Sequence, residues 1–109
     1  MITRNRFACK CCGQNLIKAE VITLCKTIET KVGLPLTINS GYRCLSHNAK
    51  IGSKSTSQHV KGNAADITCS NLVKLKQECK KMWDNNEIRG YGSNYPRFVH
   101  VDTGGHRTW

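Results

Sequence analysis

Apolar residues recur every three or four positions in two long stretches of the chain. In the first, from about Leu16 to Val32, apolar side chains share one side and charged ones fall largely on the other. This period predicts an amphipathic helix, which Gly33 and Pro35 would end. The second stretch, from Asn71 to about Asn85, has the same period and follows Ser70, a residue suited to capping a helix. We therefore predict two long helices.

Shorter segments predict the strands. They are rich in β-branched residues or alternate between apolar and polar side chains, at residues 36–39, 64–69 and 98–103. Residues 88–92 fit a further strand or a turn, and residues 45–51 fit one or two helical turns. A polar loop at residues 53–58 leads to His59. The chain shows no internal repeat or linker, which indicates one domain.

Alternation along the strands places ionisable side chains on strand faces. Asp66 lies on one face of its strand, although its neighbours in sequence are apolar. His100 and Asp102 share a face of the final strand, while the valines next to them point the other way. If these two strands lie side by side, their polar faces line one cleft. His59, from the loop before Asp66, can then complete a cage of three side chains.

Asp66 needs a partner if it is buried, because a buried carboxylate is costly unless it is paired or binds a cation. Two imidazoles and one carboxylate with an open fourth position suit a catalytic zinc. Such a metal polarises a carbonyl and activates water as a nucleophile. The ordinary alternative is an ion pair between Asp66 and one of the 17 lysines and arginines. The spacing of His59 and Asp66 is compatible with both.

The charge balance of the 109 residues narrows the class of partner. With 17 Lys and Arg against 7 Asp and Glu, the formal net charge is +10, which favours nucleic acid, an anionic membrane or the phosphate polymers of a bacterial envelope. Aromatic residues make up only 6% and the basic residues are spread out, which argues against nucleic acid. No apolar run of 18 residues predicts a membrane span. The N-terminus lacks the apolar core of a secretory signal, so synthesis without export is expected.

Seven cysteines leave three interpretations open. Reduced thiols that pack as small apolar groups are one. A structural zinc on Cys9, Cys11, Cys12 and Cys44 is another, although Cys-x-Cys-Cys differs from the usual Cys-x-x-Cys spacing. The third is a disulfide between the first cluster and Cys44.

Three motifs carry a resemblance to a known family. They are, in chain order, SGYR at 40–43, SQHVKGNAADI at 57–67 and FVHVD at 98–102. Together they resemble the zinc D-Ala-D-Ala carboxypeptidase family, which includes phage L-alanyl-D-glutamate endolysins, D,D-dipeptidases of vancomycin resistance and periplasmic murein endopeptidases. The resemblance covers roughly residues 6–109. It implies a single peptidase domain at 1–109 with an α+β fold, in which helices flank a central antiparallel sheet.

The resemblance also implies roles for particular residues. The family's metal ligands fall on His59, Asp66 and His100, which would hold one zinc per chain. Arg43 matches the position that grips a substrate carbonyl or carboxylate, for which the rigid guanidinium fork is well suited. A structural arginine that ties a turn to the sheet is the alternative. Substrate contacts are expected from Ser57 and Gln58.

One position departs from the family pattern. Many members carry an acidic residue three positions before the last histidine, where it serves as the general base, and this chain has Arg97 there. Asp102 is the first candidate to replace it, and orienting the His100 imidazole is its competing role. Glu87 and His106 are further candidates. His47 is interpreted as a surface or turn residue.

The expected function is therefore a zinc peptidase that hydrolyses stem peptides or cross-links of bacterial peptidoglycan, as a carboxypeptidase or an endopeptidase. It would act at the cell wall as a monomer, for example as a phage lysis enzyme, and its charge suits anionic wall polymers. The alternative is a zinc-containing, inactive module of the same fold that binds cell-wall peptide or a protein. Arg97 favours that alternative. A nucleic-acid-binding protein rests on charge alone.

Overall fold

The computed structural model describes residues 2–52 and 57–109, so most of the predicted polar loop before His59, residues 53–56, lies outside the described residues. Nine elements follow one another along the chain. They are η1 (Arg4–Phe7), α1 (Ala19–Val32), β1 (Thr37–Ser40), α2 (Leu45–Lys50), β2 (Ala64–Thr68), α3 (Leu72–Asp84), β3 (Gly90–Gly92), β4 (Val99–Asp102) and β5 (Arg107–Thr108).

The strands form one sheet in the order β1-β2-β4-β3-β5. The first three pairs are antiparallel and the β3–β5 pair is parallel. The predicted α+β fold is confirmed, with a sheet that is mixed at its last pair. Strand β5 was not predicted, because two polar residues carry no apolar pattern.

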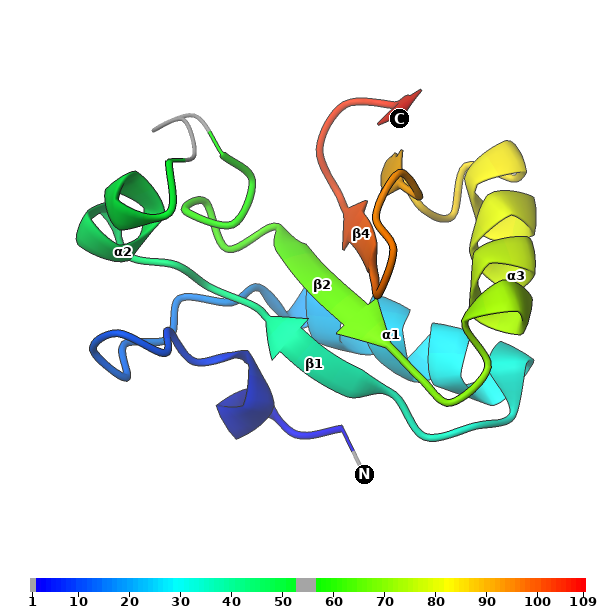
Figure 1. The fold of residues 1–109 in the computed structure, drawn as a ribbon, viewed down its shortest axis with the longest axis horizontal. Coiled ribbons are helices and arrows are strands. Elements are labelled where there is room, and N and C mark those ends of the chain that lie inside the picture. The colour runs from blue at the N-terminus through cyan, green and yellow to red at the C-terminus, as the bar shows by residue number, and fades with distance from the viewer. Residues whose placement is uncertain (1, 53–56) are drawn as a thin grey trace.

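The helices lie behind the sheet and at its ends. Figure 1 shows α1 behind the sheet, with α3 and α2 at opposite ends of the molecule. Helix α1 begins at Ala19, three residues later than predicted, and ends at Gly33, whose φ of 76° suits glycine. The α3 cap is Asn71, whose side chain accepts a hydrogen bond from the Lys74 N–H, and not Ser70 as predicted.

The two central strands have one apolar face and one polar face. On the apolar face, Ala65, Ile67 and the two valines of β4 are fully buried in the core, together with the inward side of α1. Burial of each aliphatic side chain of this size contributes about 1.5–3 kcal/mol, which keeps the pairing in register. The opposite face, toward the viewer in Figure 1, is left for polar side chains.

Within the described residues, no helix is long and apolar enough to cross a membrane.

Candidate metal centre

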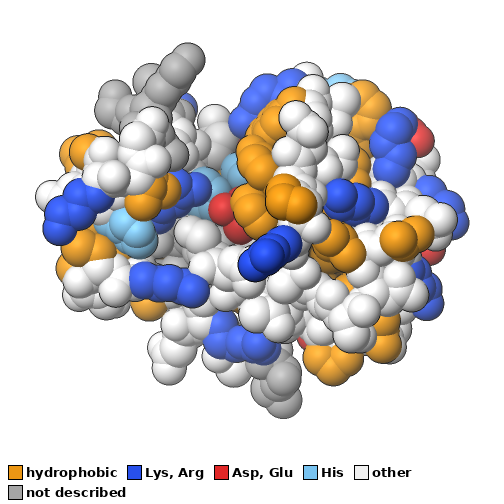
Figure 2. Space-filling model, viewed as in Figure 1, with side chains coloured by type: hydrophobic (Ala, Val, Ile, Leu, Met, Phe, Trp, Pro, Cys, Tyr) orange, Lys and Arg blue, Asp and Glu red, His pale blue; other side chains and the backbone are white. Residues whose placement is uncertain are grey.

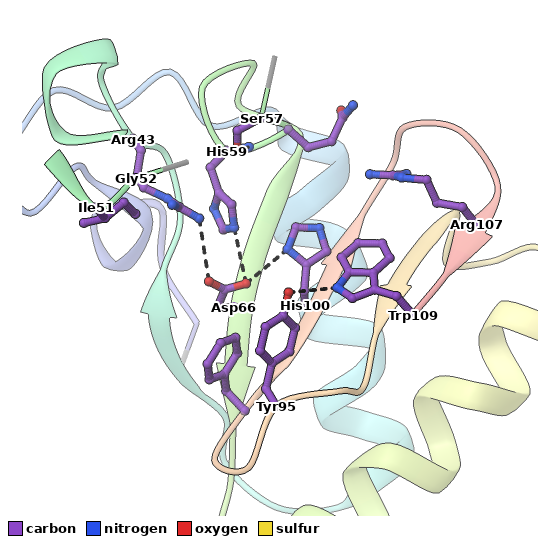
Figure 3. Close-up of a pocket in the computed structure, with 12 residues that line it drawn as sticks. Arg43, Ile51, Gly52, Ser57, His59, Asp66, Tyr95, His100, Arg107 and Trp109 are labelled. Carbon is purple, nitrogen blue, oxygen red and sulfur yellow. Dashed lines mark hydrogen bonds and ion pairs between the residues drawn. The ribbon is translucent and has the colours of Figure 1, made fainter. Parts of the chain in front are cut away.

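The three predicted metal ligands lie together, and both histidines point at one oxygen atom of Asp66. Asp66 of β2 and His100 of β4 are direct partners in the antiparallel pair, so their side chains stand next to each other on the same face. His100 Nδ1 lies 3.1 Å and His59 Nε2 lies 3.2 Å from Asp66 Oδ1. Figure 3 shows the two rings pointing at this carboxylate. The three ligand atoms lie within 4.8 Å of one another, a spacing that one metal ion can bridge.

A hydrogen bond on its far nitrogen orients His59. The Nδ1 atom lies 2.8 Å from the Gly41 carbonyl oxygen, to which only a protonated nitrogen can donate. In a neutral ring, Nε2 then carries the lone pair, and it faces Asp66. His59 is only 2% exposed, and within the described part of the chain Nε2 has no hydrogen-bond partner. A buried lone pair beside a carboxylate oxygen fits a bound cation.

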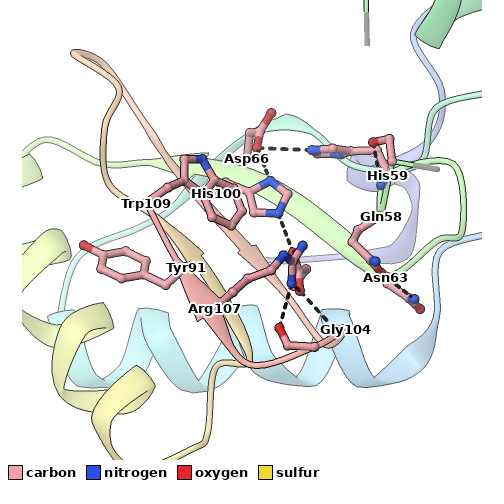
Figure 4. Close-up of polar contacts among 12 residues, drawn as sticks. Gln58, His59, Asn63, Asp66, Tyr91, His100, Gly104, Arg107 and Trp109 are labelled. Carbon is pink, nitrogen blue, oxygen red and sulfur yellow. Dashed lines mark hydrogen bonds and ion pairs between the residues drawn. The ribbon is translucent and has the colours of Figure 1, made fainter. Parts of the chain in front are cut away.

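His100 is held in the same way from its other side. Its Nε2 lies 2.7 Å from Oδ2 of Asp102, which leaves Nδ1 facing Asp66. Asp102 is fully buried and also accepts hydrogen bonds from Arg107, at 2.8 Å, and from the Gly104 N–H, at 2.9 Å. Figure 4 shows this chain of contacts from Asp66 through His100 to Arg107. Carboxylates that hold the outer nitrogen of a ligand histidine are typical of metal sites.

The charges of the site favour a cation. Burial raises the pKa of Asp66, but its interactions with His100 and His59 lower it overall, well below its usual range. Burial lowers the pKa of His100, but its hydrogen bonds to Asp102 and Asp66 raise it overall. Two ionised carboxylates thus surround one imidazole and attract positive charge. The donor set of two nitrogens and one oxygen suits zinc.

The predicted substrate-binding residues lie around this cage. Arg43 is 7% exposed, and its Nη2 lies 3.8 Å from Asp66 Oδ2. Its backbone N–H donates to the carbonyl oxygen of His59, so Arg43 also ties its loop to the ligand loop. The Ser57 hydroxyl accepts a hydrogen bond from the His59 N–H, and Gln58 accepts one from Asn63.

A cavity of about 680 Å³ opens over the cage. Figure 2 shows acidic and histidine side chains at the bottom of a hollow, with basic side chains around it. Its lining includes Tyr95, Arg107 and Trp109, which the sequence did not single out. The Trp109 indole donates a hydrogen bond to the Tyr95 hydroxyl at 2.8 Å, and the Tyr95 ring stacks on Phe98. Of these three aromatic residues, only Phe98 lies within a predicted strand, at residues 98–103, two positions before His100.

The candidates for the general base lie elsewhere. Asp102 is on the far side of the His100 ring, and both its oxygens have partners. Its position favours the orienting role over the base. Glu87 pairs with Lys31, and His106 stacks on a tryptophan ring outside the cavity. Among the described residues, Asp66 is the only carboxylate that lines the cavity.

Comparison with known proteins places the chain in a family. The family model for Peptidase M15 matches residues 1–102. The chain is also 36% identical over 94 residues to a Haemophilus influenzae protein named as a probable peptidoglycan L,D-endopeptidase, MepK. That match takes in 75% of this chain and 48% of the relative, so the chain spans about half the length of that protein. Because the family model covers nearly the whole sequence, including His59, Asp66 and His100, this chain belongs to the Peptidase M15 family.

Proposed function

We propose that this chain is a zinc-dependent peptidase that hydrolyses peptide bonds in the stem peptides or cross-links of bacterial peptidoglycan. One observation carries the proposal: two histidines, each held by a hydrogen bond on its outer nitrogen, turn their inner nitrogens to Asp66. A zinc ion held there would polarise the peptide carbonyl and activate water. The name of the Haemophilus relative supports peptidoglycan as the substrate class. The bacterial cell wall is then the place of action, and a phage lysis role stays a prediction.

The cavity lining suits a peptide that carries carboxylates. Arg43 and Arg107 place two guanidinium groups at the cavity. Arg107 already binds both oxygens of Asp102, so Arg43, which is nearer to the cage, is the residue whose fork we expect to bind a substrate carboxylate through two hydrogen bonds. We assign Arg43 the role of orienting the scissile peptide and stabilising the developing oxyanion. Ser57 and Gln58 would contact the peptide on the loop side.

Asp102 acts through His100 in this proposal. Burial raises the pKa of Asp102, but His100, Arg107 and the Gly104 N–H lower it overall, so the carboxylate is ionised at neutral pH. In a neutral His100 ring, it holds the proton on Nε2 and leaves Nδ1 unprotonated toward the cage. We therefore treat Asp102 as a positioning residue.

A second function has its own supporting observation. In the described residues the cavity holds no carboxylate besides Asp66, and the position that is acidic in many relatives carries the exposed Arg97. A cage without a proton acceptor would bind a peptide and leave it intact. The second candidate is therefore a zinc-containing module that binds cell-wall peptide.

Mass spectrometry of purified peptidoglycan incubated with the protein separates these functions. For a peptidase we expect new muropeptide products with free amines, their loss in chelator and their return with added zinc. The His100→Ala variant should release none, because a ligand is missing. His106→Ala is the matched control, because this histidine lies outside the cavity, and it should behave as the wild type. Zinc binding and muropeptide binding without cleavage would favour the module. A protein that binds no zinc, binds no muropeptide and cleaves nothing would refute both candidate functions.

A further inference from the structure

A second group of side chains that could bind a metal includes Cys44, which directly follows Arg43 in the chain. The sulfur atoms of Cys9, Cys12 and Cys44 lie within 4.8 Å of one another. His47 joins them, since its Nδ1 lies 3.6 Å from the Cys9 sulfur. Cys44 caps α2, and His47 lies half-buried within that helix and not in a turn, which was one of the two interpretations from the sequence. In Figure 1 the blue N-terminal loop and α2 lie at the same end of the molecule.

The spacing of these ligands is that of a zinc clip. Cys11 and Cys12 are both exposed, but only Cys12 belongs to the cluster, which leaves Cys9-x-x-Cys12 in one segment and Cys44-x-x-His47 in the other. The first pair sits in a turn closed by a hydrogen bond from the Gly13 N–H to the Cys9 carbonyl oxygen. Gly13 has a φ of 76°, which favours glycine at this turn. Three cysteines and one histidine form a common structural zinc site.

Backbone N–H groups already point at the sulfurs. The Cys44 N–H donates to the Cys9 sulfur at 3.5 Å, and the His47 N–H donates to the Cys44 sulfur at 3.4 Å. Such bonds stabilise the thiolate, which is the form that binds metal.

We propose that Cys9, Cys12, Cys44 and His47 hold a second zinc ion, in a closed four-ligand structural site. A disulfide would use two of the sulfurs and leave the third and the imidazole without a role. Thiolate-rich donor sets select soft or borderline cations, and an added imidazole favours zinc among them. This site does not depend on the proposed peptidase activity, because it shares no ligand with the first cage.

The second zinc would fix the loop that carries Arg43. The N–H of Tyr42 donates to the Phe7 carbonyl oxygen, and a Cβ at Gly41 would overlap Phe7, so the two segments are already in close contact. Arg43 lies directly before Cys44 and reaches Asp66. A metal bound to both segments would hold Arg43 in place, whether the cavity cleaves a peptide or only binds one.

Metal analysis of protein purified with zinc under reducing conditions tests this. We expect about two zinc ions per wild-type chain and about one for Cys12→Ser or His47→Ala. Cys11→Ser is the matched control, since it removes a neighbouring exposed cysteine outside the cluster, and it should keep both ions. His100→Ala should lose the ion of the first cage, and the double variant Cys12→Ser/His100→Ala should bind none.

Cobalt substitution identifies the ligands without relying on any variant. Only the second site contains sulfur, so wild-type protein loaded with cobalt should show a thiolate-to-metal charge-transfer band. His100→Ala should keep the band and Cys12→Ser should lose it. Absence of the band in the wild type, a zinc content unchanged by Cys12→Ser, or a disulfide among these cysteines in reduced preparations would overturn the proposal. A retained band beside an inactive cavity would refute only the peptidase.

Discussion

At the scale of single residues, the hydrogen bonds of the outer ring nitrogens of His59 and His100 orient the inner ring nitrogens toward Asp66. The Gly41 carbonyl holds His59 through Nδ1, and Asp102 holds His100 through Nε2. In neutral rings, both inner nitrogens therefore face Asp66 in the unprotonated form that a metal requires. The residue types of the cage are readable from the sequence, but these two outer partners are not, because Gly41 lies 18 residues from His59.

Asp102→Asn separates the two roles considered for this carboxylate. The amide is neutral and can donate to Nε2, which would shift the His100 proton to Nδ1 and weaken the cage. We expect zinc affinity at the first cage to fall by about 10–100-fold, the usual effect of losing such a partner. Chelator competition in a Cys12→Ser background measures this cage alone, with the exposed Asp84→Asn as control. Unchanged zinc affinity with lost hydrolysis would instead make Asp102 the base.

Two thiols in the core should not react with alkylating reagents in the folded protein. Burial raises the pKa of Cys25 and of Cys79 to about 12, so both stay protonated at pH 8 in the folded protein. We expect iodoacetamide at pH 8 to modify exposed Cys11 readily and to leave these two unmodified until denaturant is added. Peptide mass spectrometry of the alkylated protein reads this directly. Modification of Cys25 at the rate of Cys11 would contradict the burial described here.

At the scale of elements, the pairing of β2 with β4 builds the cage and one turn completes it. Antiparallel register places Asp66 opposite His100, and the turn before β2 places His59 next to Asp66, above it in Figure 3. That turn contains Gly62, with a φ of 74° and its N–H donating to the His59 carbonyl. A Cβ at this position would overlap the backbone carbonyl of Leu16. The glycine of the His-x-x-Gly motif therefore serves both backbone conformation and close packing.

Two glycine substitutions separate these contributions. Gly52 has a φ of 78°, and a Cβ added there would meet no atom of the described residues within 4 Å. Gly52→Ala should therefore cost only the strain of a left-handed alanine, about 1–2 kcal/mol. Gly62→Ala adds the overlap with Leu16 and should cost roughly 3–5 kcal/mol. Urea unfolding of both variants measures the difference in the free energy of unfolding. Equal losses would show that the Leu16 contact relaxes freely.

At the scale of the whole molecule, a net charge of +10 surrounds a cavity with a carboxylate at its centre. Basic side chains are scattered over the face in Figure 2, with no single arm or stripe. Such a distribution attracts a polyanion over a broad surface and does not select one orientation of the bound polymer. Anionic wall polymers fit this attraction, and the cage itself would act on the peptide.

Salt should therefore weaken wall binding. Raising sodium chloride from about 10 mM to about 1 M shortens the Debye length from ~30 to ~3 Å and screens surface charges. We expect the fraction of protein that sediments with purified walls carrying anionic polymers to fall steeply over this range. Walls stripped of those polymers are the control, and at low salt they should bind less of the protein than walls that carry the polymers. Binding that ignores both salt and polymer content would exclude an electrostatic contribution.

Local pattern predicted most of the elements, and the motifs that resemble a known family assigned the cage residues. Helices α1 and α3 and strands β1, β2 and β4 follow from periodicity, because each buries one side against a common core. Strand β3 lies in a segment that the sequence left open between a strand and a turn. The predicted face of Asp66 and the face of His100 are both confirmed by the register of β2 and β4. The departure at Arg97 was equally visible in the sequence.

Tertiary structure alone decided which distant residues join each site. Strand β5 has no apolar pattern, yet its parallel pairing with β3 brings Arg107 to Asp102 and Trp109 to the cavity. Cys9 and His47 are 38 residues apart, and only the packing of the N-terminal loop against α2 makes them neighbours. A chain's local periodicity records which side of an element is buried. It does not record which other segment will cover that side, since this depends on the energy of the whole packed core.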